Sequence, residues 1–231
     1  MHALGVLVTG DPVELVERKR GSFADLIRGT LGDAGVERVV VVDARRESLA
    51  PLRDVSGLII TGSPESVTSR ASWIVEAEQA VATLARAGMP TLGICFGHQL
   101  LAQALGGQVE KNPRGREIGS VALELLGADP LFEGVPTPLV ANMSHRDSAT
   151  RLPDGAELLA RSELEPHAAV RFLPRTWGVQ FHPEFDADVM RGYIAARRSV
   201  LAEEGIDADA LAATDAPAAA RLLRKFVELA R

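Results

Sequence analysis

The sequence predicts an α/β protein with a doubly wound, mostly parallel central sheet flanked by helices. Through the first hundred residues, short apolar runs rich in β-branched residues alternate with helix-like stretches. Such runs are typical of strands buried on both faces of a parallel sheet. After residue 107 the pattern changes to short strands and turns, and the last segment is helical. The alternation therefore indicates right-handed crossovers, followed by a helical C-terminal extension.

The predicted parallel strands are four apolar runs, residues 3–10, 37–44, 56–62 and 91–95. Two helices are predicted among them. In residues 72–87, apolar side chains recur at i, i+3, i+7 and i+10 from Ile74, which makes one apolar stripe. The second helix, residues 97–105, has a similar spacing and ends at two consecutive glycines.

The second half of the sequence adds shorter strands and then helices. The predicted strands are residues 119–126, 138–145, 168–173 and 176–182, and the predicted helices are residues 188–205 and 217–230. We expect one domain over residues 1–185, with residues 186–231 as a helical extension that packs on that same domain.

Composition excludes several classes of function. The chain has 231 residues, 46% hydrophobic and 24% charged, with a net charge of -6, which argues against a nucleic-acid surface. No run approaches the ~18 apolar residues of a membrane helix, and no basic stretch precedes a long apolar run as in a signal peptide. A single cysteine suits a reducing compartment. We expect a cytoplasmic protein without a metal or other cofactor, because no Cys/His cluster has ligand spacing.

The single cysteine lies in Gly93-Ile94-Cys95-Phe96-Gly97, the spacing of a nucleophile elbow with sulfur in place of oxygen. Glycines are needed there because the turn is sharp and neighbouring strands leave no room for side chains. A cysteine at a helix N-terminus is favoured as the thiolate, and the N–H of Phe96 would point to where an oxyanion forms. By itself, the pentapeptide also fits a buried structural cysteine at a strand end.

A base and its orienting acid are found in one short stretch, Gly178 to Phe185, which reads GVQFHPEF. His182 and Glu184 are two residues apart in a segment expected to be extended, so they would project to the same side. A carboxylate beside an imidazole selects its tautomer and stabilises the imidazolium. The order nucleophile, histidine, acid differs from that of α/β-hydrolases, where the acid precedes the histidine.

Together, GICFGHQLLAQALGG (residues 93–107) and GVQFHPEF resemble the class I glutamine amidotransferases, whose triad is Cys-His-Glu. The similarity is closest to the glutaminase domain of GMP synthetase and its free-standing relatives, including γ-glutamyl peptidases. It extends over roughly residues 4–186, and the segments at 58–67, 112–119 and 142–148 also resemble that subfamily. The fold implied is flavodoxin-like.

The resemblance implies a mechanism and a set of site residues. Cys95 would attack the side-chain amide of glutamine to give a γ-glutamyl thioester and ammonia, with His182 moving the proton and Glu184 orienting His182. The oxyanion hole would be the main-chain N–H groups of Gly62 and Phe96. The implied substrate-binding residues are Ser63, Gln99, Ser144 and His145. Ser63 stands where the family usually has the second glycine of Ser-Gly-Gly-Pro, which leaves the selectivity of the pocket open.

Three functions remain open from the sequence. The leading hypothesis is a glutaminase-type hydrolase that releases ammonia from glutamine or another γ-glutamyl compound; because no SGGxDS or other nucleotide-binding loop is present, any synthetase that accepts this ammonia would be a separate subunit. The second is a free-standing γ-glutamyl peptidase. The third is a non-catalytic binding protein on the same scaffold, since fold alone does not establish activity. The intact triad favours an enzyme.

Overall fold

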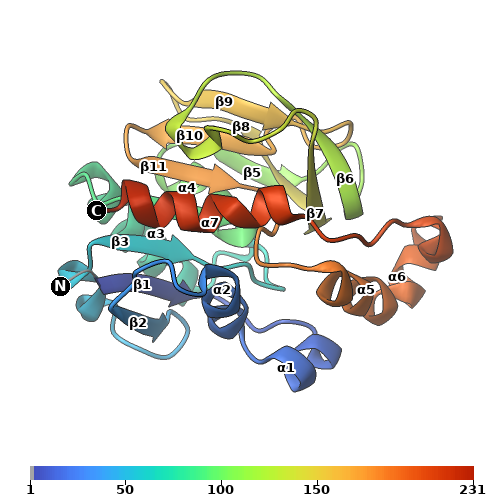
Figure 1. Ribbon diagram of the computed structural model, residues 1–231, viewed down its shortest axis with the longest axis horizontal. Helices are drawn as coiled ribbons and strands as arrows, with labels where there is room; N and C mark the ends of the chain where they lie inside the picture. The colour runs from blue at the N-terminus through green and yellow to red at the C-terminus, as the bar shows by residue number, and fades with distance from the viewer. Residues whose placement is uncertain (1–2) are drawn as a thin grey trace.

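A nine-stranded sheet forms the centre of the protein in the computed structural model, which describes residues 3–231 (Figure 1). Five neighbouring strands are parallel, in the order β2 (Arg38–Asp43), β1 (Ala3–Val8), β3 (Gly57–Ile60), β4 (Thr91–Ile94) and β11 (Thr176–Val179). The sheet continues with antiparallel strands, β10 (Ala169–Leu173), β9 (Glu157–Arg161), β6 (Glu117–Leu125) and β7 (Leu139–His145). The α/β class and the large central sheet are confirmed.

Helices cover both faces of the parallel strands. On one face lie α2 (Phe23–Leu31) and α7 (Pro217–Leu229), and on the other lie α3 (Ser72–Arg86) and α4 (Phe96–Ala104). Successive residues of a strand point to opposite faces, so Val6 of β1 packs in the core under α2 and α7 while Leu7 packs under α3 and α4. This two-sided burial explains the nearly continuous apolar runs in the sequence.

A third group of helices lies beyond the carboxyl ends of the parallel strands, at the right of Figure 1. It consists of α1 (Glu14–Arg20), α5 (Ala187–Ala196) and α6 (Arg198–Glu203). A separate two-stranded sheet pairs β5 (Gln108–Lys111) with β8 (Asp147–Arg151), next to α4. Short 3-10 helices span Ala50–Asp54, Val67–Ser69, Pro130–Phe132 and Ala208–Ala210.

The structure differs from the sequence prediction in several elements, among them the strands β5, β8 and β9, which were not assigned from the sequence. The strand predicted at 37–44 is not buried on both faces, because β2 is the edge of the sheet and Val41 is exposed. The helices α1 and α2 were not assigned from the sequence; α2 begins with a capping box of Ser22 and Asp25. The single helix predicted at 188–205 is broken at Arg197, which ends α5 and precedes α6.

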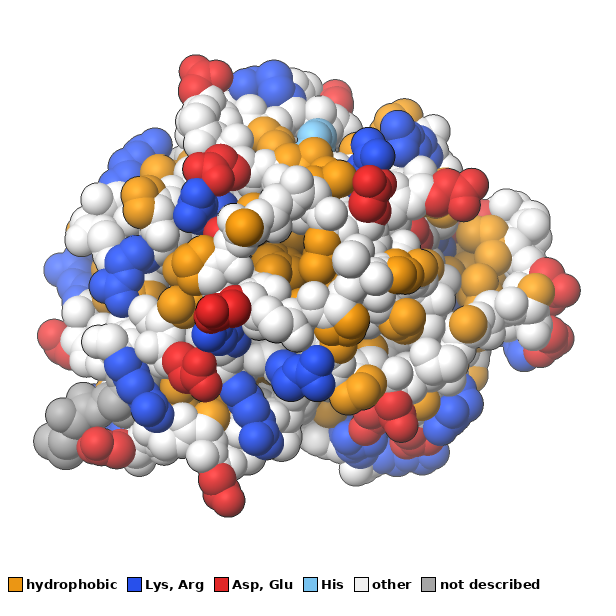
Figure 2. Space-filling model, turned by 45° about the horizontal axis from the view of Figure 1, so that its top comes forward, with side chains coloured by type: hydrophobic (Ala, Val, Ile, Leu, Met, Phe, Trp, Pro, Cys, Tyr) orange, Lys and Arg blue, Asp and Glu red, His pale blue; other side chains and the backbone are white. Residues whose placement is uncertain are grey.

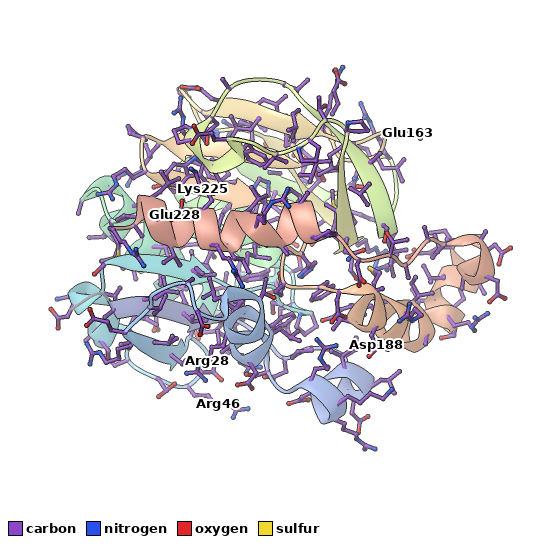
Figure 3. All side chains as sticks on the ribbon, viewed as in Figure 1. Arg28, Arg46, Glu163, Asp188, Lys225 and Glu228 are labelled. Atoms are coloured by element: carbon purple, nitrogen blue, oxygen red, sulfur yellow. The ribbon has the colours of Figure 1, made fainter. Side chains whose placement is uncertain are left out.

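The surface carries charges of both signs. Figure 2 shows Lys and Arg interspersed with Asp and Glu around one face, with hydrophobic side chains gathered toward its middle. On α7, Lys225 Nζ lies 3.7 Å from Glu228 Oε2, and Figure 3 labels both side chains. Among residues 3–231, none of the helices combines the length and the hydropathy required to span a bilayer.

We expect Phe226→Ala to destabilise the fold, because Phe226 of α7 is fully buried in the core beneath that helix and packs edge-on against Trp177. Truncation of a buried aromatic residue costs about 3–5 kcal/mol. The free energy of unfolding in urea measures this, with Glu228→Ala on the exposed side of α7 as the matched control. An equal effect of both variants would show that α7 does not cover the sheet in solution.

Candidate active site

Cys95 lies between β4 and α4 in a strained conformation. Its φ of 51° and ψ of -101° lie in a region that residues with a side chain rarely adopt. The Cys95 N–H donates to the Val179 carbonyl of β11 at 2.8 Å, which ties the turn to the neighbouring strand. The sulfur lies at the N-terminus of α4, as the sequence predicted for a nucleophile elbow.

The two flanking glycines are required by close packing. A Cβ on Gly93 would lie 2.4 Å from the main chain of Gly97, and a Cβ on Gly97 would lie 2.5 Å from the carbonyl oxygen of Ile60. Real Cβ atoms do not approach other atoms so closely, and these contacts are with main chain that cannot rotate away. The Gly-x-Cys-x-Gly spacing is therefore a packing requirement of the β4–α4 turn.

His182 and Glu184 follow β11 and contact each other, with His182 Nδ1 2.8 Å from Glu184 Oε1. The predicted contact is present, but the segment is a turn and not an extended strand, since the Phe185 N–H donates back to the His182 carbonyl at 3.3 Å. The His182 N–H in turn donates to the Asn142 carbonyl of β7 at 2.8 Å. The three residues predicted as the triad thus come together where β4 and β11 end.

The imidazole of His182 is buried between aromatic rings. It stacks on Phe185 with ring centroids 4.0 Å apart, and the ring of Phe23 lies 6.2 Å away. Burial by itself would lower the pKa of His182, but the Glu184 carboxylate and the Cys95 sulfur outweigh it and raise the pKa to about 10. These two groups therefore favour the imidazolium form of the ring.

Two main-chain N–H groups near the sulfur make no hydrogen bond within residues 3–231, those of Gly62 and Phe96. The peptide unit of Gly62 is fixed, because its carbonyl side, Thr61 O, accepts from Gly97 N at 3.2 Å and from Thr9 Oγ1 at 3.0 Å. In a planar trans peptide the N–H then points the opposite way. A Cβ on Gly62 would lie 2.8 Å from His182 Cε1, which places this residue directly against the imidazole.

Cys95 opens on two pockets. The main pocket, of about 320 Å³, is lined by the predicted residues Ser63, Phe96, Gln99, Ser144 and His145. The small pocket, of about 100 Å³, lies on the His182 side of the sulfur.

Among the predicted substrate-binding residues, Ser63 and Gln99 have side chains engaged in the protein. Ser63 Oγ donates to the Thr9 carbonyl at 2.8 Å, so the hydroxyl is held by main chain. Gln99 Nε2 donates to the Asp147 carbonyl at 2.8 Å and to Gln180 Oε1 at 2.9 Å, which leaves its own carbonyl oxygen as an acceptor.

Ser144 and His145 differ in the groups that they contact. The Ser144 carbonyl is 4.0 Å from Cys95 Sγ, and its buried hydroxyl has no partner within the described residues. The His145 ring lies between carboxylates, 3.3 Å from Glu117 and 3.7 Å from Glu165. Burial opposes charging, yet these carboxylates raise the pKa of His145. The ring is thus part of a buried ionic network that fixes the loop after β7.

Sequence reasoning missed Tyr193 and Arg197, which line the small pocket from the end of α5. They lie in a helical pattern outside any motif, so the sequence carries no signal for them. Glu117, in the segment 112–119, and Glu165, in a loop, were also missed, because their contacts with His145 join parts of the chain far apart in sequence. Within residues 3–231, no group of three His, Cys, Asp or Glu side chains is arranged to hold a metal ion.

Comparison with known proteins shows which family this chain is similar to. The family model described as glutamine amidotransferase class-I matches residues 19–199. A glutamine-hydrolyzing GMP synthase of Archaeoglobus fulgidus, named as one subunit of that enzyme, is 33% identical over 180 residues, which cover 75% of this chain and 92% of that protein. The glutamine-hydrolyzing GMP synthase of Aeropyrum pernix is 37% identical over 174 residues, 75% of this chain and 33% of that protein. The chain therefore spans about a third of the length of the latter relative.

The fold is also shared with solved structures. The crystal structure of a glutamine amidotransferase from Thermotoga maritima superposes with a TM-score of 0.76 at 24% identity, over 100% of this chain and 98% of that one.

We expect Gly97→Ala to destabilise the protein, because its Cβ would strike the Ile60 carbonyl. Overpacking of this kind costs about 1–3 kcal/mol. Urea denaturation measures the change, with Gly29→Ala as the matched control. A Cβ at Gly29 of α2 meets nothing within 4 Å, so that change is expected to be neutral or to stabilise by up to about 1 kcal/mol. A neutral Gly97→Ala would contradict the packing described for the turn.

We expect Glu184→Gln to lower the pKa of His182 well below the value of about 10, because it removes the carboxylate that raises it. A raised pKa stabilises the folded state fully below the unfolded pKa of about 6.5, and this contribution is lost as the pH rises through about 10. The stability advantage of the unmodified protein over the variant should therefore be largest below pH 6.5 and shrink toward pH 10. Ring titration by NMR and urea unfolding across this range measure both effects; a His182 pKa unchanged in the variant would refute the assigned cause.

Proposed function

The chain is a member of the class I glutamine amidotransferase family, which are cysteine-dependent amide hydrolases, and we propose that Cys95, His182 and Glu184 carry its glutaminase reaction. The observation that supports these roles is the buried His182, held 2.8 Å from Glu184 and charged under the influence of both Glu184 and the Cys95 sulfur. A thiolate–imidazolium pair oriented by a carboxylate is the arrangement that nucleophilic catalysis by cysteine requires.

In the first half-reaction, the Cys95 thiolate attacks the side-chain amide carbon of glutamine. The C–S bond forms as the carbonyl π electrons move to oxygen, and the His182 imidazolium gives its proton to the amide nitrogen. The tetrahedral intermediate then collapses, the C–N bond breaks, and ammonia leaves. The product is a γ-glutamyl thioester on Cys95 beside a neutral His182.

In the second half-reaction, neutral His182 takes a proton from water, which attacks the thioester carbon. Collapse of this second intermediate breaks the C–S bond and returns Cys95 as the thiolate beside an imidazolium. Glutamine and water are thereby converted to glutamate and ammonia. Glu184 accepts the Nδ1–H of His182, so that the other ring nitrogen faces the reacting atoms.

The oxyanion of both intermediates would be bound by the main-chain N–H groups of Gly62 and Phe96. Both groups lack a hydrogen-bond partner within the described residues, and the Gly62 peptide is held in place by Thr9 and Gly97. Preorganised donors of this kind cost no reorganisation during the reaction, and removal of one typically slows catalysis by about 10²–10³-fold.

The main pocket would hold the amino-acid end of glutamine. The carbonyl oxygen of Gln99 and the main chain at Ser144 and His145 are acceptors suited to an ammonium group. Ser63 would shape the wall, since its hydroxyl is held by Thr9 O. The ionic network of His145 with Glu117 and Glu165 would keep this wall rigid.

The acceptor of ammonia would be a separate synthetase subunit. The relative from Archaeoglobus fulgidus, of which the chain covers 92%, carries the name of a GMP synthase subunit, which supports a two-protein arrangement. In this arrangement residues 1–185 form the glutaminase domain, and residues 186–231 pack on it as an extension. A nucleophilic thiol has to stay reduced, which supports a cytoplasmic location.

The direct test is release of ammonia and glutamate from glutamine by the isolated protein and its Cys95→Ser variant. We expect the variant to lose at least about a thousandfold in kcat, because a hydroxyl at this position lacks the thiolate's nucleophilicity. A γ-glutamyl dipeptide measured in parallel distinguishes a glutaminase from a peptidase. Unchanged turnover of glutamine by Cys95→Ser would contradict the proposed catalytic role of Cys95.

A further inference from the structure

Arg197 lines both pockets at Cys95 and belongs to no motif of the site. It lies at the break between α5 and α6, with φ of -106° and ψ of 7°, and its N–H donates to the Tyr193 and Ile194 carbonyls at 3.2 Å each. At this break the chain changes direction, whereas an unbroken helix would continue straight. Arg197 lies at that change of direction. Its side chain lies over the ring of Tyr193, with Cζ 4.9 Å from the ring centroid.

The guanidinium of Arg197 has no anionic partner among the described residues, 3–231. The other arginines of the main pocket differ: Arg116 makes a two-pronged ion pair with Glu204, at 2.7 and 3.1 Å, and Arg146 is exposed at the rim. The carboxylate of the small pocket, Asp11, is paired with Arg45 at 2.6 Å. Arg197 is therefore a partly buried cation that faces the cavity unpaired.

Electrostatics around Arg197 favour an incoming anion. Burial lowers the pKa of Arg197 and the neighbouring Arg116 lowers it further, while Tyr193 and the Cys95 sulfur act in the opposite direction; the guanidinium stays charged at neutral pH. A cation removed from water without a counter-ion is destabilising, and an anionic ligand would relieve this. The aromatic ring of Tyr193 fixes the planar group without using its N–H donors, which remain free to bind a carboxylate in two-pronged fashion.

We propose that Arg197 binds the carboxylate of the substrate and so restricts the enzyme to γ-glutamyl compounds with a free carboxylate. This inference rests on the proposed glutaminase function, whose substrate, glutamine, carries one carboxylate, on its α-carbon. In a γ-glutamyl dipeptide, the amino acid that leaves as the amine also carries a carboxylate, which Arg197 could bind in the same way. Arg197 borders both pockets, so its position fits a carboxylate on either part of the substrate. An experiment therefore has to distinguish the two.

The experiment compares Arg197→Met with Arg198→Met on two substrates, L-glutamine and L-glutamine α-amide, by release of ammonia from the γ-amide. Arg198 is the adjacent residue, exposed and paired with Asp209 at 2.7 Å, and lines neither pocket. Loss of a charge-assisted hydrogen bond should lower kcat/KM for glutamine by about 10- to 100-fold in Arg197→Met, mainly through KM. The α-amide should change by less than about twofold, and Arg197→Lys should recover part of the loss.

A second arm assigns the source of the carboxylate. If γ-glutamylglycine loses activity in Arg197→Met while glutamine and γ-glutamylmethylamide do not, Arg197 binds the carboxylate of the leaving amine. Equal losses for glutamine and its α-amide, with no selective loss for γ-glutamylglycine, would overturn the proposal.

A readout without turnover separates this inference from the proposed function. Alkylation of Cys95 by 6-diazo-5-oxo-L-norleucine, a diazoketone with the α-carboxylate of glutamine, is followed by mass spectrometry against neutral iodoacetamide. Slower diazoketone alkylation in Arg197→Met, with an unchanged iodoacetamide rate, supports carboxylate binding even where glutamine is not turned over. Absence of Cys95-dependent turnover would instead count against the proposed function alone. Equal rates of diazoketone alkylation in both proteins would count against an α-carboxylate site at Arg197.

Discussion

The backbone of Cys95, held at positive φ, is the constraint on which the rest of the site depends. A residue with a side chain in such a conformation costs about 1–3 kcal/mol and persists only where its surroundings fix it. Here the surroundings are the contact of Gly93 with Gly97, the Ile60 carbonyl, and the hydrogen bond from Cys95 to Val179. Together these contacts hold the buried sulfur at the carboxyl end of β4, at the first turn of α4, and leave the N–H of Phe96 free.

The parallel half of the sheet then assembles the site from distant parts of the chain. The neighbouring strands β3, β4 and β11 end at the same edge, so the residues that follow them, Gly62, Cys95 and His182, meet there. The antiparallel half contributes through β7, where Asn142 anchors the His182 turn and the Ser144 carbonyl faces the sulfur. The carboxyl ends of these strands thus bring together the proposed nucleophile, base and main-chain donors, and Arg197 and Val200, from the break between α5 and α6 and from α6, line the main pocket there.

What the sequence predicts well is what local packing dictates. Buried parallel strands require apolar runs, and the elbow requires glycines on both sides of Cys95, so both leave clear patterns. The contact of His182 with Glu184 was also predictable from their spacing, although the turn that creates it was not. Arg197 and the break between α5 and α6 leave no such pattern, because the contact of Arg197 with Tyr193, four residues earlier, is one that an unbroken helix would equally allow. The network of His145, Glu117 and Glu165 joins three strands or loops far apart in sequence, which periodicity cannot reveal.

In the proposed mechanism, one covalent glutamyl intermediate on Cys95 links release of the amine to attack by water. Hydroxylamine, added as a competing nucleophile, tests this through the ratio of glutamyl hydroxamate to glutamate formed. We expect the same ratio from glutamine and from γ-glutamylmethylamide, because both substrates pass through the same thioester, and we expect neither product with Cys95→Ser. A ratio that depends on the leaving amine would contradict it, since the nucleophile would then attack the substrate before the amine departs.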